Sequence, residues 1–314
     1  MNTYVKVFAP ATVANVICGY DVLGFALNEP GDEVEISLKS DPGIELAEIT
    51  GDNGLLPKDP SKNTVTATIK GILKKVGKEN LGVSVKLHKK MPIGSGLGSS
   101  AASTVAGIYG VNKLLGDPLS VKELMPFAMQ GEEIACGQGH ADNVAPSLYG
   151  GFVLIRSYDP LDIIPLPTPE KLIATVIHPQ IEIQTRDARK IVRQHILLKD
   201  AIGQWGNIAG LVSGLYREDY GLIGRSLEDK LIEPSRAILI PEFYNIKKKA
   251  LELGALGFGI SGSGPSVFAL SKDEKTAHNI KTMVQSEFDI IGIPSEAYVS
   301  KINAEGPKVL SVKS

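Results

Sequence analysis

The chain has 314 residues, which suggests about two domains, and its 43% hydrophobic and 22% charged residues exclude extensive disorder. The net charge of −2 argues against a nucleic-acid binder, since such proteins usually carry an excess or a stripe of Lys and Arg. Two cysteines outside any C-x-x-C motif, no signal-peptide pattern and no apolar run of about 18 residues predict a reduced, cytoplasmic protein without a membrane span.

Short runs rich in β-branched residues predict strands at residues 4–8, 33–38, 83–88, 151–156 and 172–178. A helix is predicted over residues 99–115, because Gly-Asp-Pro follows it and stops it. Ser120 and Glu123 have the spacing of a capping box, which opens a second helix. Pro126 should kink that helix or delay its start. The mixture of elements predicts an α+β fold.

A proline-rich stretch at residues 160–169 is the best candidate for a domain boundary. It holds four prolines between two predicted strands. Because proline cannot donate to a sheet ladder, we expect the stretch to belong to neither strand. The predicted domains are therefore residues 1–160 and 161–314.

The clearest candidate site is a glycine- and serine-rich loop between the predicted strand at 83–88 and the first helix. Its glycines let backbone N–H groups crowd round an anion, and the helix directs the positive end of its dipole at the same point. It is not a Walker A loop, because no Lys-Ser or Lys-Thr follows, and a plain turn with a serine cap is the alternative. We expect the loop to hold the phosphates of ATP, with these residues: Pro92, Ile93, Gly94, Ser95, Gly96, Leu97, Gly98, Ser99, Ser100, Ala101 and Ala102.

A second glycine-rich stretch lies at residues 257–265. It contains a formal G-x-G-x-x-G, but it leads into a strand-like segment and not a helix, so the dinucleotide-binding context is missing. So many glycines still predict a backbone that passes very close to another backbone or to a ligand.

Two polar residues near the start of the chain, Asn15 and Asp21, stand among small and apolar residues. They either form turns with their own backbone or belong to a site. Glu132 could supply a carboxylate oxygen to Mg²⁺, which binds only one or two carboxylates besides phosphate oxygens. No H-E-x-x-H motif is present, so a zinc site is not favoured.

Four further residues are candidates for binding a small polar molecule. His140 and Asn143 bracket a polar turn, where the structural alternative is ordinary hydrogen bonding. Arg189 and Arg236 are surface residues by default. If the two arginines converge, they would suit a carboxylate, because guanidinium groups bind it through two hydrogen bonds.

Together these segments resemble the GHMP kinase superfamily. Residues 10–24, 92–102 and 259–269 are similar to its three motifs, in order along nearly the whole chain. Within the superfamily the pattern is most similar to the homoserine kinase family, whose first motif reads P-A-T-S-A-N-L-G-x-G-F-D-x-L-G. Val13, Ile17 and Tyr20 depart from it. The run at 140–146 is similar to that family's H-x-D-N-x-A-P.

The resemblance implies a first domain like the second domain of ribosomal protein S5, a ferredoxin-like second domain, and a homodimer. It implies ATP-dependent phosphorylation of the hydroxyl of L-homoserine, in threonine biosynthesis. By the same resemblance Ser100 and Glu132 are Mg²⁺ ligands, and Asn63 begins the adenine-side segment. Thr185 lies near the transferring phosphate, and the homoserine site consists of Asn15, Asp21, His140, Asn143, Arg189 and Arg236.

Three points stay open from the sequence. Asp21 could hold the ammonium group or orient the hydroxyl. Asn143 stands where galactokinase and mevalonate kinase have an Asp base, which favours phosphoryl transfer without a side-chain base. The alternatives for the chain as a whole are a GHMP kinase for another alcohol, such as mevalonate or a sugar, and a relative that binds ATP or a metabolite without catalysis.

Overall fold

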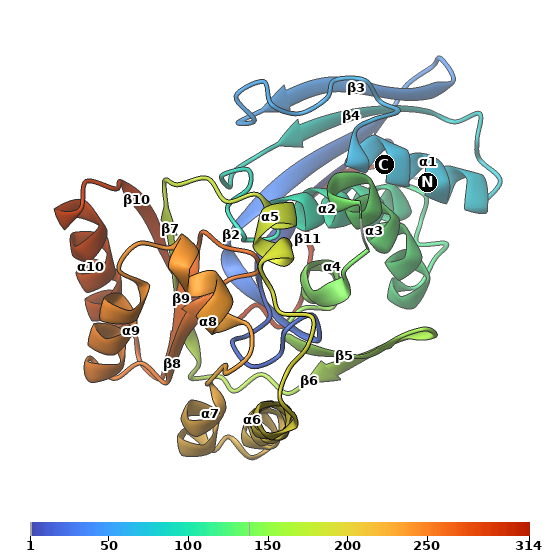
Figure 1. The fold of residues 1–314 in the computed structure, drawn as a ribbon. Helices are drawn as coiled ribbons and strands as arrows, with labels where there is room; N and C mark the ends of the chain where they lie inside the picture. Colours follow the sequence, from blue (N-terminus) through green and yellow to red (C-terminus); the bar gives the residue numbers. More distant parts are fainter. Residues whose placement is uncertain (1, 138) are drawn as a thin grey trace.

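In the computed structural model, which describes residues 2–137 and 139–314, two sheets lie next to each other (Figure 1). The larger sheet has seven strands, with the order β11-β1-β2-β4-β3, and β5 joins β2 and carries β6. Among the strands of the described residues, only β3 and β4 pair in parallel. The strands are β1 (Tyr4–Ala14), β2 (Leu23–Leu38), β3 (Gly43–Thr50), β4 (Gly82–His88), β5 (Phe152–Tyr158), β6 (Leu161–Leu166) and β11 (Lys308–Lys313).

Four helices accompany this sheet: α1 (Thr64–Lys75), α2 (Ser99–Leu114), α3 (Val121–Cys136) and α4 (Ala141–Tyr149). The helix α2 contacts β1 and β2, and it is buried along almost its whole length because Ala, Gly and Ser dominate its sequence. The capping box of Ser120 and Glu123 is confirmed at the start of α3. The expected delay at Pro126 was wrong, because the helix already begins at Val121 with its first N–H groups capped.

The smaller sheet has the order β10-β7-β9-β8, with every neighbouring pair antiparallel. Its strands are β7 (Ile173–Pro179), β8 (Gly257–Ile260), β9 (Val267–Ser271) and β10 (Ser295–Lys301). The helices α9 (Phe243–Glu252) and α10 (Glu274–Ile290) pack against it. The remaining helices are α5 (Thr185–Lys190), α6 (Leu198–Arg217), α7 (Tyr220–Ser226), α8 (Glu233–Arg236) and the 3₁₀ turn η1 (Ala237–Leu239).

A shared apolar core joins the two sheets. Successive residues of β9 alternate between its faces, so Phe268 belongs to the core of the larger sheet, while Val267 packs with the residues of α9 and α10. The ring of Phe25 in β2 lies 4.9 Å from that of Phe152 and 5.8 Å from that of Phe268. This common core fixes the two parts against each other, and with them the walls of any cleft between them.

The five strands and the helix at 99–115 expected from the sequence are confirmed, with β1, β2 and β4 longer than expected and the other bounds shifted by one or two residues. The proline-rich stretch belongs to neither of the two predicted strands beside it, as expected, but it contains a strand of its own. Residues 161–166 form β6, which pairs with β5. Pro165 is tolerated there because, among the described residues, β6 pairs with β5 alone and needs no N–H donor on its other edge. The chain also returns to the first sheet at its end, where β11 pairs with β1. The division into residues 1–160 and 161–314 stays a prediction.

No helix in the described part of the chain is both long and apolar enough to span a bilayer.

Candidate active site

One cleft of about 1350 Å³ brings most of the predicted site residues together. They come from the loop after β1, the glycine-serine loop, and the helices α3, α4, α5 and α8. The predicted residues that line the cleft are Asn15, Asp21, Asn63, Ile93, Gly94, Ser95, Gly96, Gly98, Ser99, Ser100, Glu132, His140, Asn143, Arg189 and Arg236. Leu97, Ala101 and Ala102 are instead buried in the core behind the loop, and Pro92 does not line the cleft.

The glycine-serine loop adopts a conformation that only glycines adopt without strain. Gly94, Gly96 and Gly98 all have positive φ, at 72°, 79° and 66°, and Gly98 is the N-cap of α2. A Cβ at Gly98 would lie 2.2 Å from Oγ1 of Thr12. The backbone of the loop therefore packs directly against its surroundings, as a cradle for an anion requires.

The second glycine-rich stretch lies behind this loop, as its composition predicted. The hydroxyl of Ser261 donates to the carbonyl oxygen of Gly96 at 2.8 Å, and the N–H of Ser266 donates to that of Ser95 at 3.2 Å. A Cβ at Gly96 would lie 2.7 Å from the carbonyl oxygens of Ser261 and Gly264. These glycines serve a close backbone-to-backbone contact that fixes the phosphate loop.

A buried ion pair lies beneath the first turn of α2. Lys89 donates to the Asp32 carboxylate, to the carbonyl oxygen of Ser99 at 2.9 Å and to the hydroxyl of Ser103 at 2.6 Å. Asp32 also accepts from the backbone N–H of Lys90 at 2.9 Å. Burial lowers the pKa of Lys89, and the Asp32 carboxylate opposes that shift. The pair ties the end of β4 to the start of the helix that faces the phosphate site.

Two buried carboxylic acids, Glu132 on α3 and Asp142 on α4, lie on the wall of the same cleft. Burial raises the pKa of each carboxyl group to about 7. The negative charge of Asp142 adds to this shift at Glu132, and that of Asp21 adds to it at Asp142. Oε1 of Glu132 and Oγ of Ser95 are buried with no hydrogen-bond partner among the described residues. Such atoms require a partner, and a cation at Glu132 and a phosphate at Ser95 would each supply one.

A cluster of charged residues forms the opposite part of the cleft. Asp21 accepts two hydrogen bonds from Arg189, at 2.8 and 3.2 Å, which makes a bidentate ion pair. Burial lowers the pKa of Arg189, but the hydrogen bond to Asp21 and the charges of Asp21 and other nearby acidic groups together outweigh it, so the arginine pKa is raised. Arg236 donates to the carbonyl oxygens of Ala188 and Gly262, at 3.1 and 3.0 Å.

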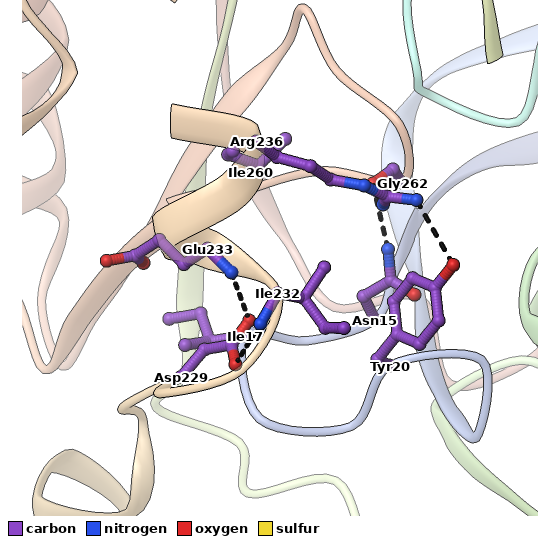
Figure 2. Close-up of a pocket in the computed structure, with 9 residues that line it drawn as sticks. All are labelled: Asn15, Ile17, Tyr20, Asp229, Ile232, Glu233, Arg236, Ile260 and Gly262. Carbon is purple, nitrogen blue, oxygen red and sulfur yellow. Dashed lines mark hydrogen bonds between the residues drawn. The ribbon is translucent and has the colours of Figure 1, made fainter. Parts of the chain in front are cut away.

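The two arginines converge, as binding of a carboxylate would require. Nη1 of Arg189 and Nη2 of Arg236 both donate to the hydroxyl of Tyr20, at 3.3 and 3.2 Å. Figure 2 shows Arg236 reaching this hydroxyl beside Asn15 and Gly262. The cleft therefore combines a phosphate cradle with a paired-arginine site.

Comparisons with known proteins agree with this arrangement. Residues 63–151 match the model of the GHMP kinases N-terminal domain, and residues 211–290 match that of the GHMP kinases C-terminal domain. Homoserine kinase of Chloroherpeton thalassium is 48% identical over 313 residues, which cover 96% of this chain and 98% of the relative. The chain belongs to the homoserine kinase family.

Solved structures of the GHMP kinases share the fold. The crystal structure of homoserine kinase from Cytophaga hutchinsonii has a TM-score of 0.96 and 57% identity, and the match covers 99% of this chain and 98% of that one. A mevalonate kinase of L. major, at 15% identity and a TM-score of 0.71, shows the same fold alone. The expected two-domain α+β architecture, with its S5-like and ferredoxin-like parts, is thereby confirmed.

Two predicted asparagines use their side chains in contacts within the protein. Asn15 accepts from the N–H of Asp21 at 3.0 Å and donates to the carbonyl oxygen of Gly262 at 2.8 Å, so the turn expected there also links two motifs. Oδ1 of Asn143 accepts from the Thr12 hydroxyl at 2.8 Å, so Nδ2 is the part of this amide that can donate to a ligand.

His140 lies beside the ion pair of Asp21 and Arg189. Its Nδ1 is 3.9 Å from Oδ1 of Asp21. Burial and the positive charge of Arg189 lower the pKa of His140, so the imidazole is neutral at pH 7. A neutral ring can accept as well as donate, which suits contact with a hydroxyl group.

Two predicted residues are placed less directly. Asn63 lines the cleft, but its side chain caps α1 by accepting from the N–H of Val65 at 3.1 Å and donates to the carbonyl oxygen of Pro57 at 3.3 Å. A contact between Asn63 and ATP stays a prediction. The backbone of Thr185 opens α5, whereas its side chain lies outside the part that the structure describes.

The residues that the sequence did not indicate are Tyr20, Lys89, Asp32 and Asp142. The one signal for Tyr20 is its departure from the Phe of the family motif. Asp32 and Lys89 are separated by 57 positions in the chain, and only the pairing of β2 with β4 brings them together. Asp142 stood inside a recognised motif, but nothing in the sequence shows that its carboxyl group is buried.

Proposed function

We propose that this chain transfers the γ-phosphoryl group of ATP to the hydroxyl of L-homoserine in the cleft described above. The observation that carries the proposal is the convergence, in one cleft, of the phosphate loop with two arginines, Asp21 and Asn143. A phosphate donor and an amino-acid acceptor need these two kinds of site side by side, because positioning and charge neutralisation dominate phosphoryl transfer.

The phosphate side is built from backbone groups and two hydroxyls. N–H groups of residues 94–98 and the first turn of α2 hold the phosphate oxygens, and Oγ of Ser95 gains the partner that it lacks. Glu132 and Ser100 would hold Mg²⁺, which suits a site where a single carboxylate faces phosphate oxygens. When bound, the cation neutralises charge on the transferring phosphoryl group.

The acceptor side orients an amino acid by its charges. Arg236 and Arg189 bind the α-carboxylate, and Asp21 binds the ammonium group or orients the hydroxyl. Nδ2 of Asn143 and the neutral ring of His140 contact the hydroxyl, and Thr185 lies near the transferring phosphoryl group. Because Asp21 and Arg189 are already paired, binding of the acceptor must share or exchange their hydrogen bonds.

No side-chain base is part of this proposal. An amide such as that of Asn143 cannot take a proton at neutral pH, and both carboxylate oxygens of Asp21 already accept hydrogen bonds from Arg189. The hydroxyl proton therefore passes late to a phosphate oxygen. The absence of a side-chain base would be contradicted by a pH profile of kcat that shows the titration of a carboxylate acting as a base. The contradiction requires that Asp21→Asn abolishes this titration without loss of homoserine binding.

The direct test is incubation of the chain with ATP, Mg²⁺ and L-homoserine, followed by detection of ADP and O-phospho-L-homoserine by mass spectrometry. Both products are expected in equal amounts. Binding of ATP without product at saturating homoserine would favour the non-catalytic alternative. A cytoplasmic homodimer, implied by the family, completes the proposal, and light scattering of the purified chain tests the dimer.

A further inference from the structure

The hydroxyl of Tyr20 occupies a special position between the two arginines. It lies 3.3 Å from Nη1 of Arg189 and 3.2 Å from Nη2 of Arg236. Both guanidinium groups also lie over the aromatic ring, at 5.8 and 4.9 Å from its centroid. In Figure 2 the ring stands beside Asn15, with its hydroxyl directed toward the end of the Arg236 side chain.

The direction of these hydrogen bonds leaves the phenol proton unused. A guanidinium group only donates, so the oxygen of Tyr20 accepts from both arginines and keeps its own O–H for another acceptor. Among the described residues no oxygen takes that proton. Burial, with the negative charge of Asp21, raises the pKa of Tyr20, so the phenol remains protonated at neutral pH.

Part of each guanidinium group near this point is already engaged. Arg189 uses both terminal nitrogens on Asp21, and Arg236 uses Nε and Nη1 on backbone carbonyl oxygens. An anionic group that approaches the two cations therefore meets their remaining N–H groups together with the Tyr20 hydroxyl, a donor that both arginines hold in a fixed position.

We propose that Tyr20 donates a hydrogen bond to the carboxylate of the acceptor and so acts as a specificity-determining residue of the acceptor site. The inference rests on the proposed function, because it requires an acceptor that carries a carboxylate. It adds a neutral donor to the two arginines, at the point where their guanidinium groups meet.

The test uses Tyr20→Phe in the full-length enzyme, with L-homoserine and 3-amino-1-propanol, which is the same amino alcohol without the carboxylate. The variant should raise KM for L-homoserine about tenfold, as loss of one hydrogen bond to a charged group implies, with kcat and KM for ATP unchanged. For 3-amino-1-propanol, measured as acceptor or as competitive inhibitor, the variant and the natural enzyme should be equal.

Tyr244→Phe is the matched control, since it removes an exposed tyrosine hydroxyl from α9, outside the residues that line the cleft. Thermal unfolding of each variant checks that the fold is retained. An unchanged KM for L-homoserine in Tyr20→Phe, or an equal loss with both acceptors, would overturn the inference while leaving the proposed function intact. Absence of homoserine turnover in the natural enzyme would instead overturn the proposed function itself.

Discussion

At the scale of single residues, Glu132 shows how a functional site opposes stability. Its carboxyl group is buried, lacks a hydrogen-bond partner at Oε1 and has a pKa raised to about 7. The folded protein therefore binds a proton there more tightly than the unfolded chain does, where a glutamate has its ordinary pKa. The free energy of unfolding must fall as pH rises from about 4.5 to about 7, and the loss is complete above that range.

Glu132→Gln should remove the contribution of Glu132 to this pH dependence, because an amide is neutral throughout, whereas the contribution of Asp142 remains. Without ligands, the variant is expected to exceed the natural protein in unfolding free energy by about 1–3 kcal/mol at pH 8 and to match it near pH 4.5. Urea unfolding at several pH values measures the difference. Phosphoryl transfer by the same variant should fall about 100-fold or more, since the proposed cation ligand is lost. A variant that is active, or whose unfolding has the natural pH dependence, would contradict the role of Glu132.

Unlike Glu132, Arg236 makes contacts that serve both folding and binding. Arg236→Ala should raise KM for L-homoserine by the equivalent of about 1.5–3 kcal/mol, with a smaller effect on KM for ATP. Arg236→Lys keeps the charge but cannot reach Ala188, Gly262 and Tyr20 together. Its KM for L-homoserine should lie between the values of the natural enzyme and of Arg236→Ala. Steady-state kinetics with each substrate varied in turn decides this. Equal changes in both KM values would argue against a carboxylate contact.

At the scale of elements, the phosphate loop and its neighbours form one closely packed unit. Gly94 and Gly98 both have positive φ, but a Cβ at Gly94 would meet nothing within 4 Å, whereas one at Gly98 would meet Thr12 and Asn143. An alanine at Gly94 therefore introduces backbone strain alone, whereas an alanine at Gly98 adds a steric clash.

Gly98→Ala is expected to weaken ATP binding at least tenfold, because the N-cap of α2 must move away from Thr12. Gly94→Ala is the matched control and should cost only the strain of a positive φ, about 1–2 kcal/mol of stability. Calorimetric titration with ATP, together with thermal unfolding, measures both. If the two variants bind ATP equally well, the close packing at Gly98 does not shape the phosphate site.

A second unit links the loop after β1 to α8. Asp229 accepts from Gln204 and from the N–H groups of residues 231, 232 and 233, and Gln204 also donates to the carbonyl oxygen of Cys18 at 2.8 Å. Residues 15–17 in the linked loop have positive φ without a glycine among them, so the loop needs such support. The network fixes Tyr20 and Arg236 relative to each other.

Asp229→Asn should therefore loosen the acceptor site and leave the phosphate site unchanged. We expect a loss of about 1–3 kcal/mol in unfolding free energy and a several-fold higher KM for L-homoserine, with KM for ATP unaffected. Chemical unfolding and kinetics provide the two values. A higher KM for ATP would show that this network supports the whole cleft.

Local sequence patterns predicted the elements well where the cause is local. Alternation in β1 and β4, the glycine stop of α2 and the capping box of α3 all depend on neighbouring residues, and all are confirmed. The strand inside the proline-rich stretch was not predicted, because β6 depends on its pairing with β5, which is a tertiary contact. The positive φ of Val16 and Ile17 was equally hidden, since nothing about β-branched residues predicts it.

The candidate site was predictable in its members but not in its geometry. The motifs supplied the phosphate loop, Glu132 and both arginines, and the structure places them around one cleft. The pairing of Asp21 with Arg189, the meeting of both arginines at Tyr20, and the buried pair of Asp32 and Lys89 join residues far apart in the chain. Such contacts depend on the packing of the two sheets.

At the scale of the whole molecule, the shared core explains how the two walls of the cleft keep their distance. Phe25 and Phe268 join the two sheets, and the last strand returns to the first sheet beside β1. The phosphate loop belongs to one sheet and Arg236 to the helices beside the other, so the cleft forms only when both parts are folded.

The central claim is that this cleft selects an amino-acid alcohol for phosphorylation by ATP. The most direct measurement is kcat/KM for L-homoserine and for mevalonate in the same ADP-release assay. Because mevalonate has no ammonium group for Asp21, its kcat/KM is predicted to be at least about 100-fold lower, the equivalent of one lost charged hydrogen-bond pair. Equal values, or a preference for mevalonate, would contradict the account.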